Sequence, residues 1–398
     1  IRNNSLRYFP LLTILAAALP GAEPNIFFNG RLQLIGESRI RYEGRYHVGF
    51  GTAADYDVAL LRQRLGFSYK PNTDIEIRVI GQDTRAPLYG PNAPSFLRDG
   101  TDLYEAYIDL FGKRKTGFAL RAGRSTLSYG DTRFIGSPQW ANLARTYDMA
   151  RAQWRTKQAT WEFLFVSPTF IDINRFNKPI LREHLLGTYN TFGKWAELYV
   201  LRHRQPGTLE SVITGGRLMA PLGKFKLTIE PVTERVTRDA VATVEGALST
   251  NLSRKIRDID VSLEYKFASS GFDQMYPAIH DKLGHEDLFA WRNLHNFRAF
   301  GTWRPLKTLA INFMYNANWL VDPRVGVYNT QNRLIARDIT GRSSRWAGQE
   351  VDSYMNWTYR KFMTLGGGMG AYANGTFFRA TTPNRSPVFY YIHHTFTM

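Results

Sequence analysis

The sequence contains no cysteine, far fewer acidic than basic residues, and no hydrophobic run long enough to cross a bilayer as a helix. Without cysteine the chain has neither a disulfide framework nor a thiolate metal site. A mean hydropathy of -0.33 excludes a bundle of membrane helices, because each span would need about 20 apolar residues. The same value is compatible with a transmembrane barrel, whose polar interior offsets an apolar exterior.

The charge balance is strongly basic. The 398 residues include 51 Lys and Arg against 34 Asp and Glu, a formal net charge of +17. Such an excess favours anionic partners, namely nucleic acid, lipopolysaccharide phosphates or a polyanionic solute. Most of the excess is arginine spread along strand-like segments, with no lysine-rich tail or basic helix, so no nucleic-acid partner is expected.

Residues 307–319 show the pattern that is most informative about the fold. Every second residue from Leu309 to Trp319 is apolar, and Phe313 and Tyr315 make that face aromatic, whereas the alternate face is rich in asparagine. Successive side chains of a strand point to opposite faces. An aromatic face opposite an uncharged polar face is typical of a strand with lipid outside and water inside.

Similar segments recur along the chain, each near the length of about 9–11 residues that a tilted membrane strand requires. The candidate strands are 31–44, 57–69, 73–83, 101–111, 116–124, 145–155, 159–167, 183–192, 194–203, 209–220, 223–235, 238–249, 255–267, 293–304, 307–319, 349–360, 362–374 and 387–398. The sequence therefore predicts an all-β protein, a closed antiparallel transmembrane β-barrel of about 18 strands formed by residues 23–398.

Connection lengths support this prediction, because such barrels have short periplasmic turns and long external loops. The expected tight turns are Pro71-Asn72, Gly112 to Lys115, Gly193, Pro221-Leu222, Pro305-Leu306 and Lys361. The expected long loops are 84–100, 125–144, 168–182, 268–292, 320–348 and 375–386.

The first 22 residues have the features of a secretory signal. Arg2 and Arg7 precede an apolar run from Tyr8 to Leu19, and small residues follow as far as Ala22. We expect residues 1–22 to be removed near Ala22; the alternative is a buried N-terminal helix. Export together with the barrel pattern predicts the outer membrane of a Gram-negative bacterium, with outer-membrane lipids around the barrel.

The apolar face of each strand determines which residues face the interior. If the apolar residues of the early strands point outward, the inward positions include five arginines: Arg41, Arg62, Arg64, Arg78 and Arg121. The alternation in 101–111 places Tyr104, Ala106, Ile108 and Leu110 outward and Glu105 and Asp109 inward. An Arg or Lys facing lipid near the midplane costs about 2–4 kcal/mol, which supports this assignment. The arginines either line a pore or form ion-pair ladders with Glu76, Glu105 and Asp109 that brace the wall, and both roles are compatible.

A second charged group lies in the expected external loop and its flanking strands. It consists of Arg124, Asp131, Arg133, Arg145, Asp148 and Arg151. One interpretation is a loop that folds into the mouth as a constriction, with its arginines ordered by Asp131 and Asp148. The other interpretation is a salt-bridged surface loop stabilised by turns at Gly130 and Gly136.

The same region carries a motif. It comprises Gly123-Arg124, Tyr129-Gly130-Asp131-x-Arg133, Ile135-Gly136, Trp140-x-Asn142 and Arg145-Thr146-x-Asp148-x-x-Arg151. This motif resembles the alginate export family of outer-membrane porins, and the run Asp287 to His295 is similar to a second block of that family. The resemblance implies a monomeric eighteen-stranded barrel whose arginine-rich pore passes a linear polyuronate. The alternative is a general or small-carboxylate-selective porin without a polysaccharide role.

The remaining motifs do not indicate catalysis or a cofactor. The glycine run 366–370 lacks the Lys-Ser/Thr end of a phosphate loop, and no serine nucleophile elbow is present, so no enzyme activity is expected. His280 and His285, with Asp281, Glu286 and Asp287, are candidates for a divalent-ion site, but their spacing fits no standard one and favours a solvated polar loop. We expect neither a metal nor a cofactor. An outer-membrane hydrolase and a structural barrel with a filled lumen remain as alternatives from other classes.

Overall fold

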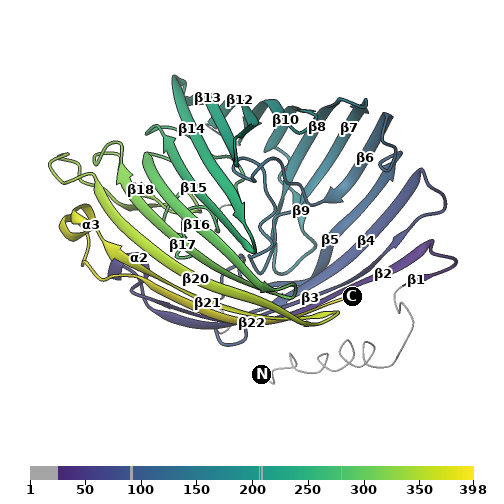
Figure 1. The fold of residues 1–398 in the computed structure, drawn as a ribbon, viewed down its shortest axis with the longest axis horizontal. Coiled ribbons are helices and arrows are strands. Elements are labelled where there is room, and N and C mark those ends of the chain that lie inside the picture. Colours follow the sequence, from purple (N-terminus) through teal and green to yellow (C-terminus); the bar gives the residue numbers. More distant parts are fainter. Residues whose placement is uncertain (1–25, 90–92, 206, 208, 279) are drawn as a thin grey trace.

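The long strands of the chain form one closed antiparallel barrel in the computed structural model, which describes residues 26–89, 93–205, 207, 209–278 and 280–398 (Figure 1). The main sheet has 20 strands, of which β1 (Ile26–Phe27) and β9 (Lys178–Pro179) have two residues each, so eighteen long strands make up the wall. The expected barrel is confirmed. The proposed signal sequence, residues 1–22, lies outside the described residues.

All eighteen predicted segments correspond to strands, with ends shifted by up to seven residues. The strands are β2 (Leu32–Tyr46), β3 (Tyr56–Tyr69), β4 (Ile75–Arg85), β5 (Asp99–Leu110), β6 (Gly117–Ser125), β7 (Tyr147–Arg155), β8 (Ala159–Phe170), β10 (His184–Phe192), β11 (Ala196–Arg204), β12 (Leu209–Leu222), β13 (Phe225–Arg238), β14 (Val241–Ile256), β15 (Ile259–Ala268), β16 (Leu294–Leu306), β17 (Leu309–Leu320), β20 (Trp346–Arg360), β21 (Met363–Asn374) and β22 (Val388–Thr397). Each pairs with its neighbours in chain order, and β22 pairs with β2 from Glu37↔Thr397 to Tyr46↔Val388. Closure leaves no sheet edge among these strands, which a barrel in lipid requires.

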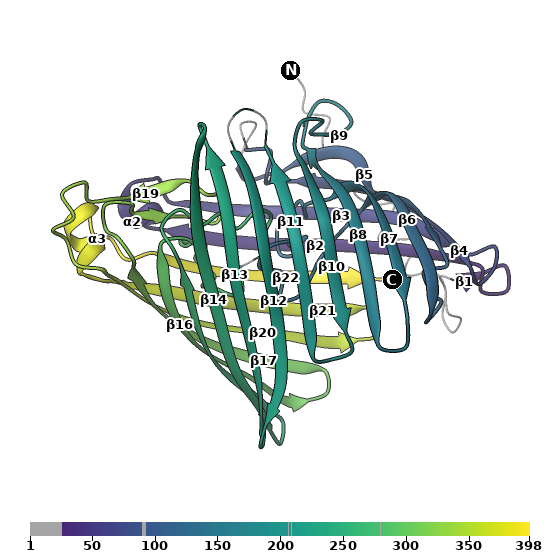
Figure 2. The ribbon, with the colours of Figure 1, turned by 90° about the horizontal axis from the view of Figure 1, so that it is seen from above.

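The two ends of the barrel differ in their connections. At one end, the turn end, two-residue turns such as Arg257-Asp258 join successive strands. At the other, the loop end, lie α2 (Val48–Gly51), α3 (Thr376–Thr381) and the hairpin of β18 (Val327–Tyr328) and β19 (Leu334–Ala336) (Figure 2). One loop-end connection, Asp239-Ala240 between β13 and β14, is as short as the turns and has positive φ at both residues.

Two of the expected turns are misplaced by two residues. Pro221-Leu222 and Leu306 still pair with the following strand, as in Pro221↔Lys226 and Leu306↔Leu309. The turns themselves are Gly223-Lys224 and Lys307-Thr308. Gly223 has a φ of 60°, a conformation that glycine adopts without steric cost. Each proline lies one residue before the end of its strand, a position where its missing N–H is tolerated, and it does not form the turn.

Apolar side chains face outward and charged or amide side chains face inward, as the alternation predicts. Leu263 is 52% exposed and Phe313 is 55% exposed, whereas their neighbours Glu264 and Asn312 are buried inside the barrel. Among the described residues, no helix is long and apolar enough to cross a membrane.

The expected outward orientation of Tyr104 is wrong. The register between β4 and β5 shifts at this point, with Ile80 opposite Glu105 and Gly81 opposite Leu103. This bulge leaves Tyr104 without an opposite residue, and both Tyr104 and Glu105 point inward. The Tyr104 hydroxyl accepts a hydrogen bond of 3.0 Å from Gln139 Nε2 inside the barrel. The alternation of side chains within one strand cannot reveal a shift in its pairing with the next strand.

The largest buried apolar cluster lies within the barrel and is built partly from loops. It joins side chains of the wall to Phe134 and Ile135 of one loop, Phe289 and Trp291 of another, and Phe378 of α3. Loops are visible between the two walls of the barrel (Figure 1). The loops therefore pack into the interior instead of lying over the rim.

Candidate functional site

The loop between β6 and β7, residues 126–146, crosses the interior of the barrel; we call it the first inserted loop. On one side it is held by arginines of β2 and β3. Arg39 Nη1 donates to the Gln139 carbonyl (3.0 Å), Arg62 Nη1 donates to the Ala141 carbonyl (2.8 Å), and Arg41 Nη1 donates to the Trp140 carbonyl. These contacts fix the loop against that wall.

The other side of the first inserted loop reaches the opposite wall through Arg133. Its guanidinium pairs with Glu230 of β13 (3.2 Å), with Glu264 of β15 and with Asp131 of the same loop (2.7 Å). Burial opposes charge on Arg133, but the three carboxylates outweigh it and raise its pKa, so this cation stays charged. The loop thus spans the interior from β2–β3 to β13–β15.

The loop between β15 and β16, residues 269–293, is a second inserted loop that packs against the first. Ile135 forms a bridge with Tyr276, and Gly136 N donates to the Tyr276 carbonyl at 2.9 Å. Arg145 Nη1 donates to the Gly136 carbonyl (3.3 Å) of the first inserted loop and to the Pro277 carbonyl (3.2 Å) of the second. Arg145 therefore fixes the two loops to each other.

An aromatic stack joins the two inserted loops farther along. The His280 ring stacks on Trp140, with ring centroids 4.5 Å apart, and also on His285, at 4.4 Å. Burial, and then the neighbouring His280, lower the pKa of His285 to about 3, so its ring is neutral at physiological pH. No group of three or more His, Cys, Asp or Glu residues in the described part of the chain is placed to hold a metal ion.

Arg124 and Asp148 form a bidentate pair at the loop end of β6 and β7. The two bonds, from Nε to Oδ1 and from Nη2 to Oδ2, are 2.7 and 2.9 Å long. Arg124 Nη2 also donates to the Asn177 carbonyl at 3.0 Å, in the loop between β8 and β10. Bidentate charge-assisted bonds of this kind hold strands and loop in one geometry.

The remaining predicted arginines line the β2–β7 wall and have acidic partners on it, except Arg151, whose partner Glu162 (4.0 Å) lies on the neighbouring β8. Arg62 and Arg64 pair with Glu37 (2.5 and 3.4 Å), Arg78 pairs with Glu105 (2.8 Å), and Arg121 pairs with Asp109 (2.6 Å). The side chains differ in access: Arg78, Arg121 and Arg151 are 30%, 23% and 18% exposed, whereas Arg41, Arg62 and Arg64 are 2%, 4% and 7% exposed. The first three are open to the lumen; the last three are engaged by the wall and the first inserted loop.

A cavity of about 260 Å³ lies between the first inserted loop and the opposite wall. Its charged lining residues are Arg133, Arg217, Lys226, Lys282, Arg298, Asp131, Glu230, Glu264 and Asp281. Of the cations, only Arg133 was expected at the site. Lys226 and Arg298 face inward on strands with clear alternation, so that pattern could have identified them; Lys282 lies in a loop and has no such signal.

Charged groups of the second inserted loop remain ionised in this cavity. Burial opposes charge on Lys282, but Asp281 and Asp131 outweigh it and raise the pKa of Lys282. Burial likewise opposes charge on Asp281, and Lys282 and Arg298 lower the pKa of its carboxyl. Fixed charges of both signs therefore border the cavity at neutral pH.

A closed barrel of membrane-length strands, apolar outside and charged within, with a loop crossing its lumen, is an outer-membrane channel of the porin class. The family model described as Alginate export matches residues 31–195 and 268–391, and the chain belongs to this family. The protein thus resides in the outer membrane of a Gram-negative bacterium. Its turn end faces the periplasm and its loop end faces outward.

Solved structures of porins from Pseudomonas aeruginosa share the fold. OccK2 (OpdF) in complex with glucuronate is 10% identical, with a TM-score of 0.65 over 92% of this chain and 98% of that chain. OpdK with vanillate is 10% identical with a TM-score of 0.63 over 92% and 98%, and OccK11 (OpdR) is 11% identical with a TM-score of 0.63 over 92% and 96%. At these identities the likeness concerns the fold alone. No curated protein sequence matches the chain.

Proposed function

We propose that the chain is a passive, monomeric channel that passes anionic saccharides, with linear uronate oligomers or polymers as its solutes. The observation that supports this most is the charge along the lumen below the first inserted loop, which we infer forms the constriction. The cavity there and the adjoining one at the turn end are lined by eight cationic residues and five acidic ones. The cationic residues are Arg133, Arg217, Lys224, Lys226, Arg254, Lys255, Lys282 and Arg298.

Partial pairing of these cations suits transport better than tight binding. Conduction requires sites that attract a solute but release it to the next site. Arg217 and Arg298, for example, already contact Glu197 (2.7 Å) and Glu264 (3.4 Å), so a solute carboxylate gains only part of their interaction. We infer that uronate carboxylates are handed along such groups, together with the open Arg78, Arg121 and Arg151 of the other wall.

The second candidate is a porin for small carboxylates. It is favoured by the first inserted loop, which divides the lumen and leaves a cavity of only about 260 Å³ beside it. The glucuronate and vanillate complexes of the two similar structures also concern small carboxylates. Both candidates are transporters, in agreement with the family and the fold.

Current recordings from single channels in planar bilayers distinguish these candidates. We expect oligogalacturonates to interrupt the current at lower concentrations than neutral maltooligosaccharides of equal length, because only the former carry carboxylates. If a polymer threads the lumen, the duration of each interruption should increase with oligomer length. Interruption by monomeric glucuronate but not by longer oligomers would favour the small-carboxylate porin. Equal effects of acidic and neutral sugars would overturn both candidates.

A further inference from the structure

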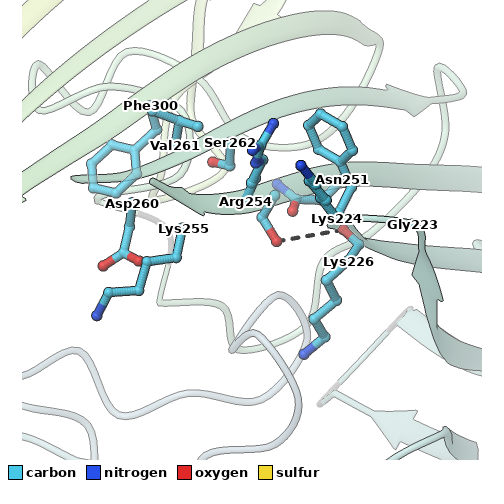
Figure 3. A pocket seen from close by; sticks show the side chains of 12 residues that line it. Gly223, Lys224, Lys226, Asn251, Arg254, Lys255, Asp260, Val261, Ser262 and Phe300 are labelled. Carbon is cyan, nitrogen blue, oxygen red and sulfur yellow. Dashed lines mark hydrogen bonds between the residues drawn. The ribbon is translucent and has the colours of Figure 1, made fainter. Parts of the chain in front are cut away.

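We infer that the periplasmic mouth carries a separate binding site for acidic oligosaccharides, formed by β12–β16 at the turn end; this inference rests on the proposed function. The site is a cavity of about 560 Å³. Four cationic side chains, Lys224, Lys226, Arg254 and Lys255, line it, and Asp260 is its one carboxylate (Figure 3). We call this cavity the mouth pocket.

The turn geometry brings these cations together. Lys224 lies in the two-residue turn between β12 and β13, and Lys226 is the second residue of β13. Lys226 is opposite Ser253 of β14, and Lys255, two residues farther on, is opposite Asp260 of β15. Residues two apart on a strand share a face, so Lys226, Ser253 and Lys255 lie on the lumenal side near the rim.

The cations of the mouth pocket differ from those at the constriction in their pairing. Asp260 forms an ion pair with Arg304 of β16, which neutralises the only acid of the pocket. Within the described part of the chain, Lys224, Lys226, Arg254 and Lys255 have no ion-pair partner. Arg254 lies over the Phe225 ring, 5.4 Å from its centroid. A solute carboxylate therefore meets three ammonium groups that form no ion pair with any described carboxylate.

Neutral polar groups complete the pocket in a way that suits a sugar. Asn251, Ser253 and Ser262 line it and supply amide and hydroxyl groups that can both donate and accept hydrogen bonds. Phe300 adds an apolar surface beside them. A few polar groups around an apolar surface fix the orientation of a small ligand. Carboxylates with many hydroxyls, the chemistry of acidic oligosaccharides, match this lining.

The mouth pocket leads directly to the cavity below the constriction. Lys226, Asn251, Ser253 and Phe300 line both. The row Lys226–Ser253–Ser262–Phe300 follows the strand register, and the next row toward the constriction contains Asn251, Glu264 and Arg298. Successive rows are about 6.6–6.8 Å apart along a strand. An acidic oligosaccharide bound at the mouth thus extends along β13–β16 toward Arg298, on the wall opposite the predicted arginines.

The absence of cysteine allows a direct test, because an introduced thiol is the only one in the protein. Ser253→Cys places a thiol in the mouth pocket, and Thr160→Cys places one on the turn-end part of β8 as a matched control. Both variants are treated with a neutral methanethiosulfonate reagent in the presence of trigalacturonate or maltotriose. At about ten times its dissociation constant, trigalacturonate should slow modification of Ser253→Cys roughly tenfold, because about one site in ten is then free.

Thr160→Cys should be modified at the same rate with either sugar, and adding Lys226→Gln and Lys255→Gln should abolish protection of Ser253→Cys. Equal protection of both cysteines, or protection that survives loss of the lysines, would overturn the mouth pocket. Current block by acidic oligomers without protection of Ser253→Cys would reject the pocket and leave the proposed function intact. Protection without any block would support the pocket and reject the proposed function.

Discussion

Replacing residues 126–146 by an Asn-Gly turn is expected to raise the single-channel conductance severalfold. Ser125 and Tyr147 lie directly opposite each other, so a two-residue turn can join β6 to β7 without moving either strand. The replacement removes the segment that spans the lumen from Arg39 and Arg62 to Glu230 and Glu264. A barrel of eighteen strands without such a segment encloses an aqueous channel. The measurement is the current step of single insertions in a planar bilayer.

A matched control removes a loop segment that does not cross the lumen. Gln331, Asn332 and Arg333 are exposed at the tip of the β18–β19 hairpin, and their deletion should leave the conductance unchanged. In gel electrophoresis, the unheated sample of each variant must migrate differently from its heated sample, as a folded barrel does. This shows that the wall is intact. Unchanged conductance of a folded variant lacking 126–146 would show that the first inserted loop is not the constriction.

Leu263→Arg is expected to lower the free energy of unfolding by about 2–4 kcal/mol, because an arginine on the lipid face loses its hydration. Leu263 points outward from β15 and is 52% exposed, whereas Ser262, the preceding residue, points into the lumen. Ser262→Arg adds the same charge one position away, on the water-facing side of the strand. It should lower the free energy of unfolding far less. The measurement is guanidinium unfolding of barrels folded into lipid vesicles.

The comparison of these two variants tests which face of β15 points toward lipid. This question is separate from whether the segment is a strand. Two similar losses of stability would mean that arginine is disruptive on either face, and a larger loss for Ser262→Arg would invert the assignment. Leu263→Met provides a further control for the loss of leucine, since a swap of similar volume usually costs less than about 1.5 kcal/mol.

The strands were predictable because lipid and water impose a period of two on every wall segment. β17 illustrates this, since Phe313 and Asn312 occupy the faces that the alternation assigns to them. Turn positions depend on local backbone conformation. One turn lies at Gly223-Lys224, where Gly223 adopts a positive φ, and not at the expected Pro221-Leu222. The bulge that turns Tyr104 inward depends on the partner strand, so β5 alone could not reveal it.

The composition of the site was harder to predict than the wall. Alternation placed Arg62 and Arg64 inside. Besides Glu37, however, their partners come from a loop more than 70 residues away in sequence, as in the bond from Arg64 to Gln139. How deeply a loop enters a barrel depends on packing, here between Phe134 and Trp291. Of the lysines of the mouth pocket, Lys226 shares the lumenal parity of Glu230 on β13, so alternation could have assigned it inward, whereas Lys224 lies in a two-residue turn, where no alternation applies.

The account depends most on a water-filled lumen whose fixed charge is positive. The zero-current potential of the wild-type channel across a KCl gradient measures that charge directly, because the mobile ion that the lumen prefers sets its sign. We predict a potential displaced toward the chloride equilibrium potential. Displacement toward the potassium equilibrium potential, or inserted barrels that carry no current, would contradict the account.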